Sequence, residues 1–416
     1  MKIWLMNHYA GHMRTDKGGR HYWFSKYLNR MGYEPVVFCS INKSEQKELW
    51  TEKMAEDIHT PFVNVRVGGT RGGGLGRIFN MVSFCFNVIR VGKQYAKQHG
   101  KPDVILASSV HPLTLVAGIK LARYFHVKCI CEMRDLWPEV IVTYSKKIKK
   151  DSLFAKVLYA GEKWIYTKAD ALIFTQEGGP DYVRTKKWDK EHGGPIDMKK
   201  AFHINNGVDL EAFDENLKNF WLDDPDMNDP DTFKVVYTGA VRKINNLGLI
   251  VDAAKLVKNP KIRFVIFGGG DQVELLKKRL VDENITNVVF KGRINKQYIP
   301  SVVARADINL VHWQMSPLLK MVGESYNKAF EYFASGKPVF YTVRPGYSIV
   351  EKYNCGLLTE GFTPQDIVNG IEKIAGMTDE ERSEMARNAR RTAEIYDFKN
   401  LTQKLVDIIH FVEDNK

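Results

Sequence analysis

The chain has 416 residues, of which 44% are hydrophobic and 26% charged, a composition that excludes disordered and collagen-like proteins. Its 61 Lys and Arg outnumber its 49 Asp and Glu, for a net charge of +12. Residues 1–210 hold 33 basic and 20 acidic side chains (+13), whereas residues 211–416 hold 28 and 29 (−1). The length is about two to three times that of a typical domain, so we expect two packed domains.

We expect a cytoplasmic protein. No run of 18 apolar residues occurs, and the start, MKIWLMNHYAGHMR, reaches polar and charged residues too early for a secretory signal. The five cysteines lack C-x-x-C spacing, which favours buried free thiols in a reducing compartment. Cys129 and Cys131 fall in one apolar run that indicates a strand, and we expect their side chains on opposite faces of it.

Apolar runs and segments of helical spacing alternate through the first half of the chain. A strand is expected at 2–7, a helix over 21–32 that ends at Gly32, and a strand from Glu34. The alternation recurs as a strand at 103–108, a helix at 113–125 and a strand at 127–133, followed by strands within 171–176 and 201–209. This order predicts a doubly wound parallel α/β sheet.

An acid-rich segment separates the two halves. Residues 211–231 contain eight acidic side chains and two prolines, which favours an exposed connection. Strands and helices alternate again beyond it, and two amphipathic helices joined at Asp397 end the chain. We therefore predict an N-terminal domain at 1–212, a linker at 213–232 and a second Rossmann-like domain at 233–397.

Ligands of open α/β sheets bind beyond the carboxyl ends of the strands, which directs attention to the strand–helix junctions. Gly18 and Gly19 precede a predicted helix and could admit a phosphate, although a plain turn explains them equally well. Arg242 and Lys243 lie between a strand and a helix, where two cations suit a diphosphate or simply a solvated loop. The triplet 268–270 lacks the G-x-G-x-x-G spacing and is interpreted as a tight turn.

The segment GESYNKAFEYFASGKPV carries four polar side chains just before and within one predicted helix. Asn327 and Glu331 are i, i+4 neighbours, and so are Glu324 and Lys328. One helix face could therefore present carboxylates to sugar hydroxyls and an ammonium to phosphate. The same spacing is also typical of an exposed, self-stabilised helix.

Four segments together, KAFEYFASGKPV, VVYTGAVRK, NNGVDLEAF and EMRDLWPEV, resemble retaining GT-B nucleotide-sugar glycosyltransferases of family 4. The likeness is greatest to the O-antigen and colanic-acid N-acetylfucosaminyltransferase branch and extends from Lys2 to about Val412. It implies two Rossmann-like sheets facing across a cleft, with an acceptor-binding first domain and a donor-binding second domain. It also implies that a last helix, about 398–416, crosses back to the first domain.

The resemblance also implies roles for individual residues in donor binding. Arg242 or Lys243, with Lys328, would neutralise the donor diphosphate, and Gly18 and Gly19 would face it from the first domain. Glu331, near Asn327, would bind the nucleotide ribose, and backbone around Ile294 would contact the base. The family's two glutamates stand eight positions apart, but Gly323 stands eight before Glu331 and Glu324 stands seven before. The sugar-contacting role of Glu324 is therefore displaced by one residue or lost.

The acceptor side departs from the family pattern. Many relatives carry a histidine where this chain has Arg134, so Arg134 and Asp135 are the candidate cleft residues. His111, at another predicted strand end, is a second candidate, and a purely structural histidine is the alternative. No D-x-D motif occurs outside the acid-rich segment, so we expect a metal-independent enzyme without a cofactor.

The implied reaction transfers a sugar, an N-acetylated or deoxy hexosamine, from a UDP-sugar to a lipid-linked oligosaccharide of a bacterial surface polysaccharide such as O-antigen or capsule. A UDP-sugar 2-epimerase has the same architecture and remains an alternative. A nucleic-acid-binding protein is suggested by the pI of about 9.2, but no RNP, KH or zinc-finger pattern occurs.

Two segments favour peripheral contact with an anionic membrane through the first domain, at the inner face of the plasma membrane. Residues 77–91 form an apolar helix with one narrow polar stripe, too short to span a bilayer. Residues 144–168 place Lys146, Lys147, Lys149 and Lys150 before an amphipathic run. A buried helix and a solvated basic loop are the respective alternatives.

Overall fold

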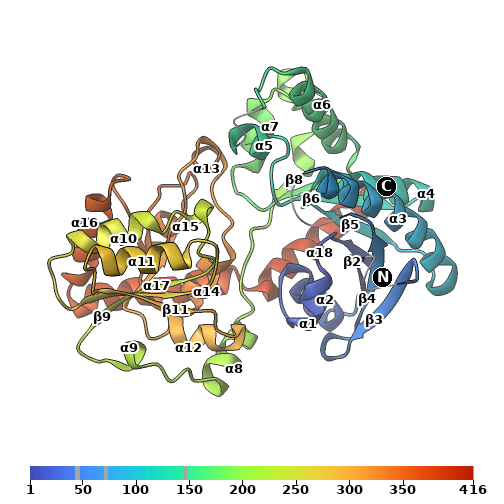
Figure 1. The fold of residues 1–416 in the computed structure, drawn as a ribbon. Coiled ribbons are helices and arrows are strands. Elements are labelled where there is room, and N and C mark those ends of the chain that lie inside the picture. Colours follow the sequence, from blue (N-terminus) through green and yellow to red (C-terminus); the bar gives the residue numbers. More distant parts are fainter. Residues whose placement is uncertain (43–46, 70–73, 110, 145–147, 416) are drawn as a thin grey trace. The chain divides into compact units, whose positions relative to one another are not determined.

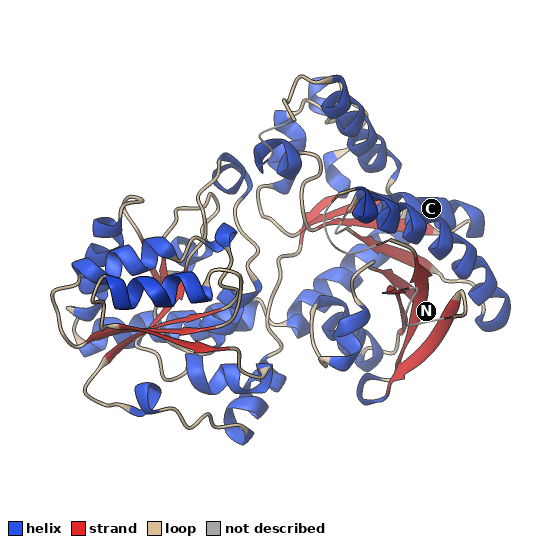
Figure 2. Ribbon diagram, viewed as in Figure 1, coloured by secondary structure: helices blue, strands red, loops and turns tan. Residues whose placement is uncertain are grey.

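The computed structural model describes the chain except for residues 43–46, 70–73, 110, 145–147 and 416 (Figure 1). It divides into two compact units, the first formed by Met1–Asn205 with Phe398–Lys416 and the second by Asn206–Asp397. Each unit contains one β-sheet with helices packed against it (Figure 2). The fold is that of two parallel-sheet Rossmann-like domains.

Unit 1 contains an eight-stranded sheet in the order β3-β4-β2-β1-β5-β6-β7-β8. All neighbouring strands are parallel except β3 and β4, which are antiparallel. The sequence analysis did not predict this edge pair, because β3 is a mostly exposed polar strand without the apolar run of its neighbours. The strands are β1 (Lys2–Met6), β2 (Glu34–Asn42), β3 (Trp50–Ala55), β4 (Thr60–Val67), β5 (Val104–Ser108), β6 (Lys128–Met133), β7 (Ala171–Phe174) and β8 (Ala201–His203).

Helices cover both faces of this sheet because the strand order reverses at β1, and right-handed crossovers to its two sides lie on opposite faces. On one face α2 (Arg20–Arg30) packs against the C-terminal helix α18 (Phe398–Asp414). On the other face α4 (Pro112–Phe125) packs between α3 (Leu75–His99) and α6 (Leu153–Lys168). The shorter helices of the unit are α1 (Gly11–Thr15), α5 (Glu139–Tyr144) and α7 (Gly179–Thr185).

Unit 2 contains a six-stranded sheet in the order β11-β10-β9-β12-β13-β14, with all pairs parallel. Buried side chains of its strands pack with α10 and α16 in the larger of two hydrophobic clusters. The strands are β9 (Phe233–Thr238), β10 (Ile262–Phe267), β11 (Val288–Gly292), β12 (Ile308–Val311), β13 (Val339–Tyr341) and β14 (Gly356–Leu358). The helices are α8 (Leu210–Asn219), α9 (Pro225–Asn228), α10 (Gly248–Leu256), α11 (Val273–Asp282), α12 (Ile299–Val303), α13 (Pro317–Val322), α14 (Asn327–Ala334), α15 (Ile349–Tyr353), α16 (Pro364–Ala375) and α17 (Asp379–Ile395).

The acid-rich segment differs from the exposed linker expected at 213–232. It contains α8 and α9, it belongs to unit 2, and the division between units falls at Asn205 rather than at 212. Asp224 caps α9 and pairs with Lys291 at 2.8 Å, while Asp226 pairs with Arg263 at 2.8 Å. Its carboxylates are thus held by cations of β10 and β11, a partnership that composition does not reveal.

The cysteine expectation needs a correction. All five thiols are buried and free, but the sulfur atoms of Cys129 and Cys131 lie 4.0 Å apart on the same face of β6. The prediction of opposite faces was wrong, because side chains two residues apart on a strand share a face. Among the described residues, no helix is long and apolar enough to cross a membrane.

Candidate active site

The carboxyl edge of the second sheet is built on closely packed glycine loops. Gly239 follows β9 and Gly268 follows β10, with φ angles of +148° and +149° that favour glycine. A Cβ atom on Gly268 would lie 1.7 Å from the carbonyl oxygen of Gly239, and one on Gly270 would lie 2.1 Å from that of Val241. The triplet 268–270 therefore allows two loops to pack backbone against backbone, which confirms its interpretation as a tight turn.

Lys328 of α14 extends its side chain to this edge. Its Nζ lies 4.0 Å from the centroid of the Tyr237 ring, and a Cβ on Gly239 would come within 2.8 Å of the same atom. The Nζ atom is buried and has no hydrogen-bond partner among the described residues. Burial lowers the pKa of Lys328 to about 7, against the opposing effect of Glu331. An anion at this point would supply the missing hydrogen bonds.

Two further cations lie in the loop that follows β9. Arg242 and Lys243 begin a short 3₁₀ turn over Lys243–Asn245, and both side chains are exposed. Within the described ranges, no carboxylate oxygen comes within 4.0 Å of the charged groups of Arg242, Lys243 or Lys328. Three cations without acidic partners therefore belong to adjoining loops and a helix at one edge of the sheet.

His312, which the sequence analysis did not select, holds this loop in place. Its ring is 1% exposed at the end of β12, with Nδ1 2.5 Å from the Thr342 hydroxyl and Nε2 3.0 Å from the carbonyl oxygen of Asn246. Burial lowers the pKa of His312 to about 4, so the ring is neutral and its Nε2–H donates to Asn246. The only sequence signal was a histidine directly after an apolar strand.

The other residues selected from the helix motif divide into two groups. Asn327 is exposed in the first turn of α14, and Glu331 lies one turn on, 3.9 Å from the Lys296 ammonium with 26% of its side chain exposed. Ile294, after β11, packs on the sheet beside Val236 and Phe267. These positions surround the carboxyl edge that carries Lys328.

Glu324, in contrast, faces the interior. It is 3% exposed, and its carboxyl lies beside the Tyr341 hydroxyl and the backbone of Ile349 at the start of α15. Burial raises the pKa of Glu324 to about 8. The structure therefore places this carboxyl in the core of unit 2 rather than beside the Lys328 ammonium.

The residues selected in the first half lie at the carboxyl edge of the first sheet. His111 is fully buried at the N-cap of α4, and its Nε2 lies 2.6 Å from Nδ1 of His8. Burial, assisted by Arg77, lowers the pKa of His111 to about 3, so the ring is neutral. Arg134 is half-buried and Asp135 exposed just after β6. Arg134 and Asp135 are thus the selected residues that solvent reaches here.

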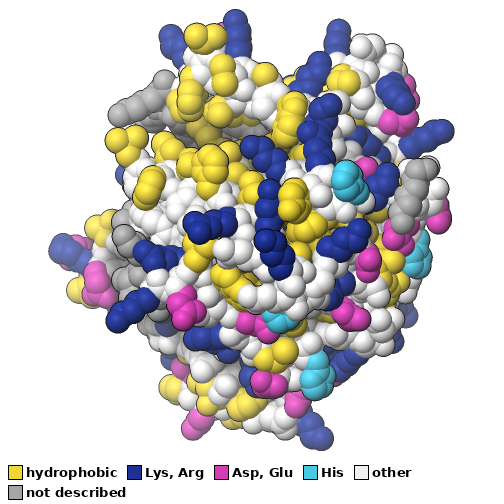
Figure 3. All heavy atoms as spheres, turned by 90° about the vertical axis from the view of Figure 1, so that its right-hand side faces the viewer, with side chains coloured by type: hydrophobic (Ala, Val, Ile, Leu, Met, Phe, Trp, Pro, Cys, Tyr) yellow, Lys and Arg dark blue, Asp and Glu magenta, His cyan; other side chains and the backbone are white. Residues whose placement is uncertain are grey.

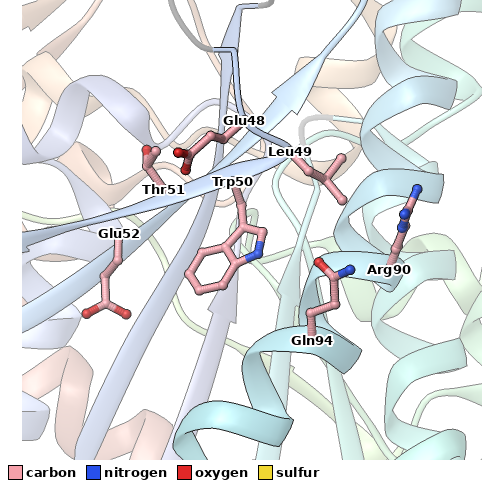
Figure 4. Close-up of a pocket in the computed structure, with 7 residues that line it drawn as sticks. All are labelled: Glu48, Leu49, Trp50, Thr51, Glu52, Arg90 and Gln94. Carbon is pink, nitrogen blue, oxygen red and sulfur yellow. The ribbon is translucent and has the colours of Figure 1, made fainter.

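A surface hollow of about 550 Å³ lies elsewhere on unit 1, between β3 and the second half of α3 (Figure 4). Trp50 forms its floor, and the Trp50 ring packs edge-on against Tyr95 at 5.6 Å. Arg90 and Gln94 of α3 line the other side. None of the residues selected from the sequence lines this hollow.

Comparisons with known proteins identify the family. Residues 222–392 match the family described as "Glycosyl transferases group 1", and residues 20–193 match the "Glycosyl transferase 4-like domain". The two matches cover most of both units. The chain belongs to the group 1, GT4-like superfamily of GT-B glycosyltransferases.

Curated relatives of this chain are bacterial proteins named as glycosyltransferases. A Bacillus subtilis (strain 168) protein named as a teichuronic acid biosynthesis glycosyltransferase, TuaH, is 27% identical over 63% of this chain and 62% of its own length. This chain therefore spans slightly less than two thirds of TuaH. A Pseudomonas aeruginosa protein named as a glycosyltransferase, WbjE, is 23% identical over 84% of this chain and 82% of its own.

Solved structures share the fold of this glycosyltransferase. Sucrose-phosphate synthase from Thermosynechococcus elongatus superposes with a TM-score of 0.72 at 17% identity over the whole of both chains. Anabaena Alr3699/HepE, solved in complex with UDP and glucose, gives a TM-score of 0.66 at 15% identity over 99% of each chain. At these identities the likeness shows the fold alone.

A buried charge network at the carboxyl edge of the first sheet was not predicted. Gly19, with φ +104°, starts α2, and the next side chain, Arg20, donates to Glu132 at 2.7 Å and to the carbonyl oxygens of Ile204 and Asn205 at 2.9 and 2.6 Å. Both charged groups are at most 2% exposed. Gly18 is buried, and its N–H donates to Met13, so the glycine pair forms a supported turn. Glu132 within the apolar run VKCICEM was the available signal, because a carboxylate buried in a strand requires a partner.

Proposed function

We propose that this glycosyltransferase takes its sugar from a nucleoside diphosphate sugar bound at the carboxyl edge of unit 2. The observation that carries this proposal is the buried ammonium of Lys328, which lies against the glycine backbone after β9 and has no hydrogen-bond partner among the residues that the structure describes. Arg242 and Lys243 lie in the loop after β9 and have no acidic partner in the described part of the chain, as a diphosphate with two negative charges requires. Glu331 would accept hydrogen bonds from the ribose hydroxyls, and the backbone near Ile294 would contact the base.

The chemistry follows from this charge distribution. Negative charge grows on the diphosphate as the anomeric C–O bond breaks, and fixed cations stabilise that charge more in the transition state than in the ground state. The acceptor hydroxyl then bonds to the anomeric carbon, and its proton passes to the departing phosphate oxygen. This route retains the anomeric configuration and uses the protein's own cations for the charge that a metal would otherwise offset. We therefore propose a retaining, metal-independent transfer.

The donor that we propose is a UDP-sugar carrying an N-acetylated or deoxy hexosamine. Support for the nucleotide comes from HepE, which was solved with UDP and glucose and shares the fold. The name of TuaH, a teichuronic acid biosynthesis glycosyltransferase, supports a place in bacterial surface polysaccharide biosynthesis. The proposed acceptor is a lipid-linked oligosaccharide at the cytoplasmic face of the membrane. Unit 1 would hold it through Arg134 and Asp135, with buried His111 at the same edge of the sheet.

A thermal-shift panel of nucleotides and nucleotide sugars, each with Mg²⁺ and with EDTA, tests the donor. A ligand at 100 times its Kd stabilises by about 2.7 kcal/mol, so UDP and UDP-sugars should raise the melting temperature equally in EDTA and in Mg²⁺. GDP-sugars should leave the melting temperature unchanged. Stabilisation by no nucleotide would overturn the proposed function, and stabilisation only with Mg²⁺ would overturn metal independence.

Product analysis tests the reaction class. The purified enzyme, a UDP-sugar and a membrane extract containing lipid-linked saccharides should give a glycolipid heavier by one sugar, with the donor's anomeric configuration in its NMR coupling constants. If a free epimerised nucleotide sugar forms without acceptor, the enzyme is an epimerase and the proposed transfer is wrong.

A further inference from the structure

Three helices on one face of the first sheet carry charge of one sign on their exposed sides. Helices α3, α4 and α6 contain nine Lys and Arg side chains and one carboxylate, Glu162. That carboxylate is 4% exposed and accepts hydrogen bonds from the hydroxyls of Tyr166 and Tyr182 at 2.7 and 2.8 Å. The exposed surface of the three helices therefore bears no acidic side chain. The cations are Arg77, Arg90, Lys93, Lys97, Lys120, Arg123, Lys156, Lys163 and Lys168.

The same layer exposes large apolar side chains in helical stripes. On α3 these are Leu75 (84% exposed), Ile78, Phe79 and Phe86 (67%), at spacings of three, one and seven residues. On α6 they are Leu153 (79%), Phe154, Val157 and Trp164. A soluble monomer seldom leaves such a set of large side chains in water, and a clustered set indicates an interaction surface.

The apolar side chains concentrate at one end of the layer. Both α3 and α6 follow strands that are parallel to β1, so each helix begins at the carboxyl edge of the sheet. Leu75, Ile78 and Phe79 occupy the first turns of α3, and Leu153, Phe154 and Val157 occupy the first turns of α6. This is the edge at which Asp135 is exposed and Arg134 is half-buried.

Apolar and cationic side chains alternate across this surface. Arg77 is exposed among the apolar side chains that begin α3, and Lys156 among those that begin α6. Aromatic rings are paired with cations further along: Lys93 Nζ lies 3.8 Å from the Tyr124 ring centroid, and the Arg123 guanidinium lies 5.7 Å from that of Trp164. Figure 3 shows hydrophobic and Lys or Arg side chains interspersed over the upper part of this side of unit 1.

We propose that the exposed side of α3, α4 and α6, called the docking face below, binds the surface of an anionic lipid bilayer. The first turns of α3 and α6 enter the headgroup region, and the surrounding cations contact acidic headgroups. Apolar side chains that protrude among cations match an interface that is negatively charged outside and hydrocarbon beneath. Amphipathic aromatic rings, such as those of Tyr124 and Trp164, favour the same boundary.

Charge argues against two other occupants. A symmetric dimer through the docking face would bring nine cations of one copy against the same nine of the other, with no exposed acid on the three helices to offset them. A nucleic acid would neutralise the cations but would leave Leu75, Phe86 and Leu153 in water. A bilayer satisfies both kinds of side chain at once.

This inference rests on the proposed function in one respect, because a lipid-linked acceptor needs an enzyme whose acceptor side lies at the membrane. Docking at the carboxyl edge of the first sheet would bring Arg134 and Asp135 toward the headgroups that carry the acceptor saccharide. Lys146 and Lys147, expected from the sequence to contribute, lie outside the described residues.

Vesicle co-sedimentation of the full chain tests the inference, with neutral phosphatidylcholine vesicles compared with vesicles that contain phosphatidylglycerol. The wild type should bind the anionic vesicles at least tenfold more tightly at low ionic strength, and the preference should shrink as salt is added. The variant with Leu75, Phe86, Leu153 and Val157 each changed to Gln should lose at least tenfold of this affinity. All four side chains are more than half exposed, so the fold should be unaffected.

Matched control variants distinguish binding through the docking face from non-specific hydrophobic adsorption to vesicles. Changing Leu275 and Val281 to Gln removes two equally exposed apolar side chains from α11 of unit 2 and should leave vesicle binding unchanged. Lys120→Glu with Lys156→Glu should reduce binding to anionic vesicles only, whereas Lys26→Glu with Lys404→Glu, on the opposite helical layer, should have little effect.

The contradicting results are distinct. Equal binding to neutral and anionic vesicles, or full binding by the four-Gln variant, would overturn the docking face. If the wild type is a dimer in lipid-free buffer and the four-Gln variant is a monomer, the occupant of the docking face is a second copy of the chain. If the protein binds duplex DNA more tightly than anionic vesicles, the occupant is a nucleic acid. UDP-sugar stabilisation of the same variants reports separately on the proposed function. If stabilisation persists while docking fails, only the membrane inference falls.

Discussion

Replacing Lys328 with Met should make the protein more stable while weakening nucleotide binding. Burial lowers the pKa of Lys328 from 10.5 to about 7 because its ammonium has no hydrogen-bond partner among the described residues. At about 1.4 kcal/mol per unit, this shift of roughly 3.5 units sets an upper bound of about 5 kcal/mol on the cost to folding at pH 7. The Tyr237 ring stabilises the ammonium by about 1 kcal/mol, and the Lys328 side chain is partly exposed to solvent. Together these effects reduce the expected gain in stability on replacement to about 2 kcal/mol. Met keeps the aliphatic packing and removes the charge.

Thermal unfolding and UDP titration measure both halves of this prediction. A gain of about 2 kcal/mol corresponds to roughly 4–8 °C in the transition of unit 2. The loss of a charged hydrogen-bond donor, about 1.5–3 kcal/mol, should raise the Kd for UDP by roughly 10- to 100-fold. Lys373→Met removes an exposed lysine of α16 as a control and should change neither quantity.

The pH dependence provides a further check on the same variant. Between pH 7 and 10.5 the unfolded chain holds a proton that folded Lys328 has released, so the wild-type stability should rise with pH across that window. The stability advantage of Lys328→Met should be largest at and below pH 7 and should close toward pH 10.5. A variant less stable than wild type, or one with unchanged UDP affinity, would refute the assignment of Lys328 as an anion-binding group.

Three other substitutions test the physical account of the two sheets. Glu132→Gln leaves the buried Arg20 charge uncompensated and should destabilise unit 1 by about 3–5 kcal/mol. Denaturant unfolding measures this loss, and an unchanged denaturant concentration at the unfolding midpoint would contradict a buried ion pair. Gly268→Ala brings a Cβ against the Gly239 carbonyl, so it should lower the free energy of unfolding by more than about 2 kcal/mol and weaken UDP binding. Unchanged stability and UDP affinity would show that the two loops can separate freely. Burial raises the pKa of Glu162 to about 8, so the folded state keeps a proton that the unfolded state loses above pH 4.5. Stability should therefore fall between pH 4.5 and 8 by up to about 1.4 kcal/mol per unit, and Glu162→Gln should flatten this slope in urea titrations at several pH values.

Much of the site could be predicted because the strand–helix junctions are visible in the sequence. Arg242, Lys243 and Lys328 were selected from residue type and position alone, and the structure leaves each without an acidic partner in the described part of the chain. Glu324 was selected by the same reasoning and instead lies in the core with Tyr341. Spacing along a helix or loop cannot tell which way a carboxyl points, because that depends on elements such as α15 that are distant in the sequence.

His312 and the Arg20–Glu132 pair show the opposite failure. Each lies at a strand or helix end, but each acquires its role only from partners that are far away in the chain. The partner of His312 is Asn246, and those of Arg20 are Glu132 and the carbonyls that follow β8. The acid-rich segment was interpreted as a linker for the same reason, since its partners Lys291 and Arg263 lie on strands well beyond it. Local composition carries no information about such pairs.

The sequence by itself determined the two α/β units, the family resemblance and the concentration of positive charge in the first half, because periodicity and composition are local properties. Only the tertiary structure decided which of those charges act together. Right-handed crossovers place α3, α4 and α6 on one face of a single sheet, so cations from separate segments form one surface with exposed apolar side chains. Nine of the 33 cations of residues 1–210 thereby lie on one layer of three helices, whereas the second half, whose charges nearly balance, places Arg242, Lys243 and Lys328 at one sheet edge.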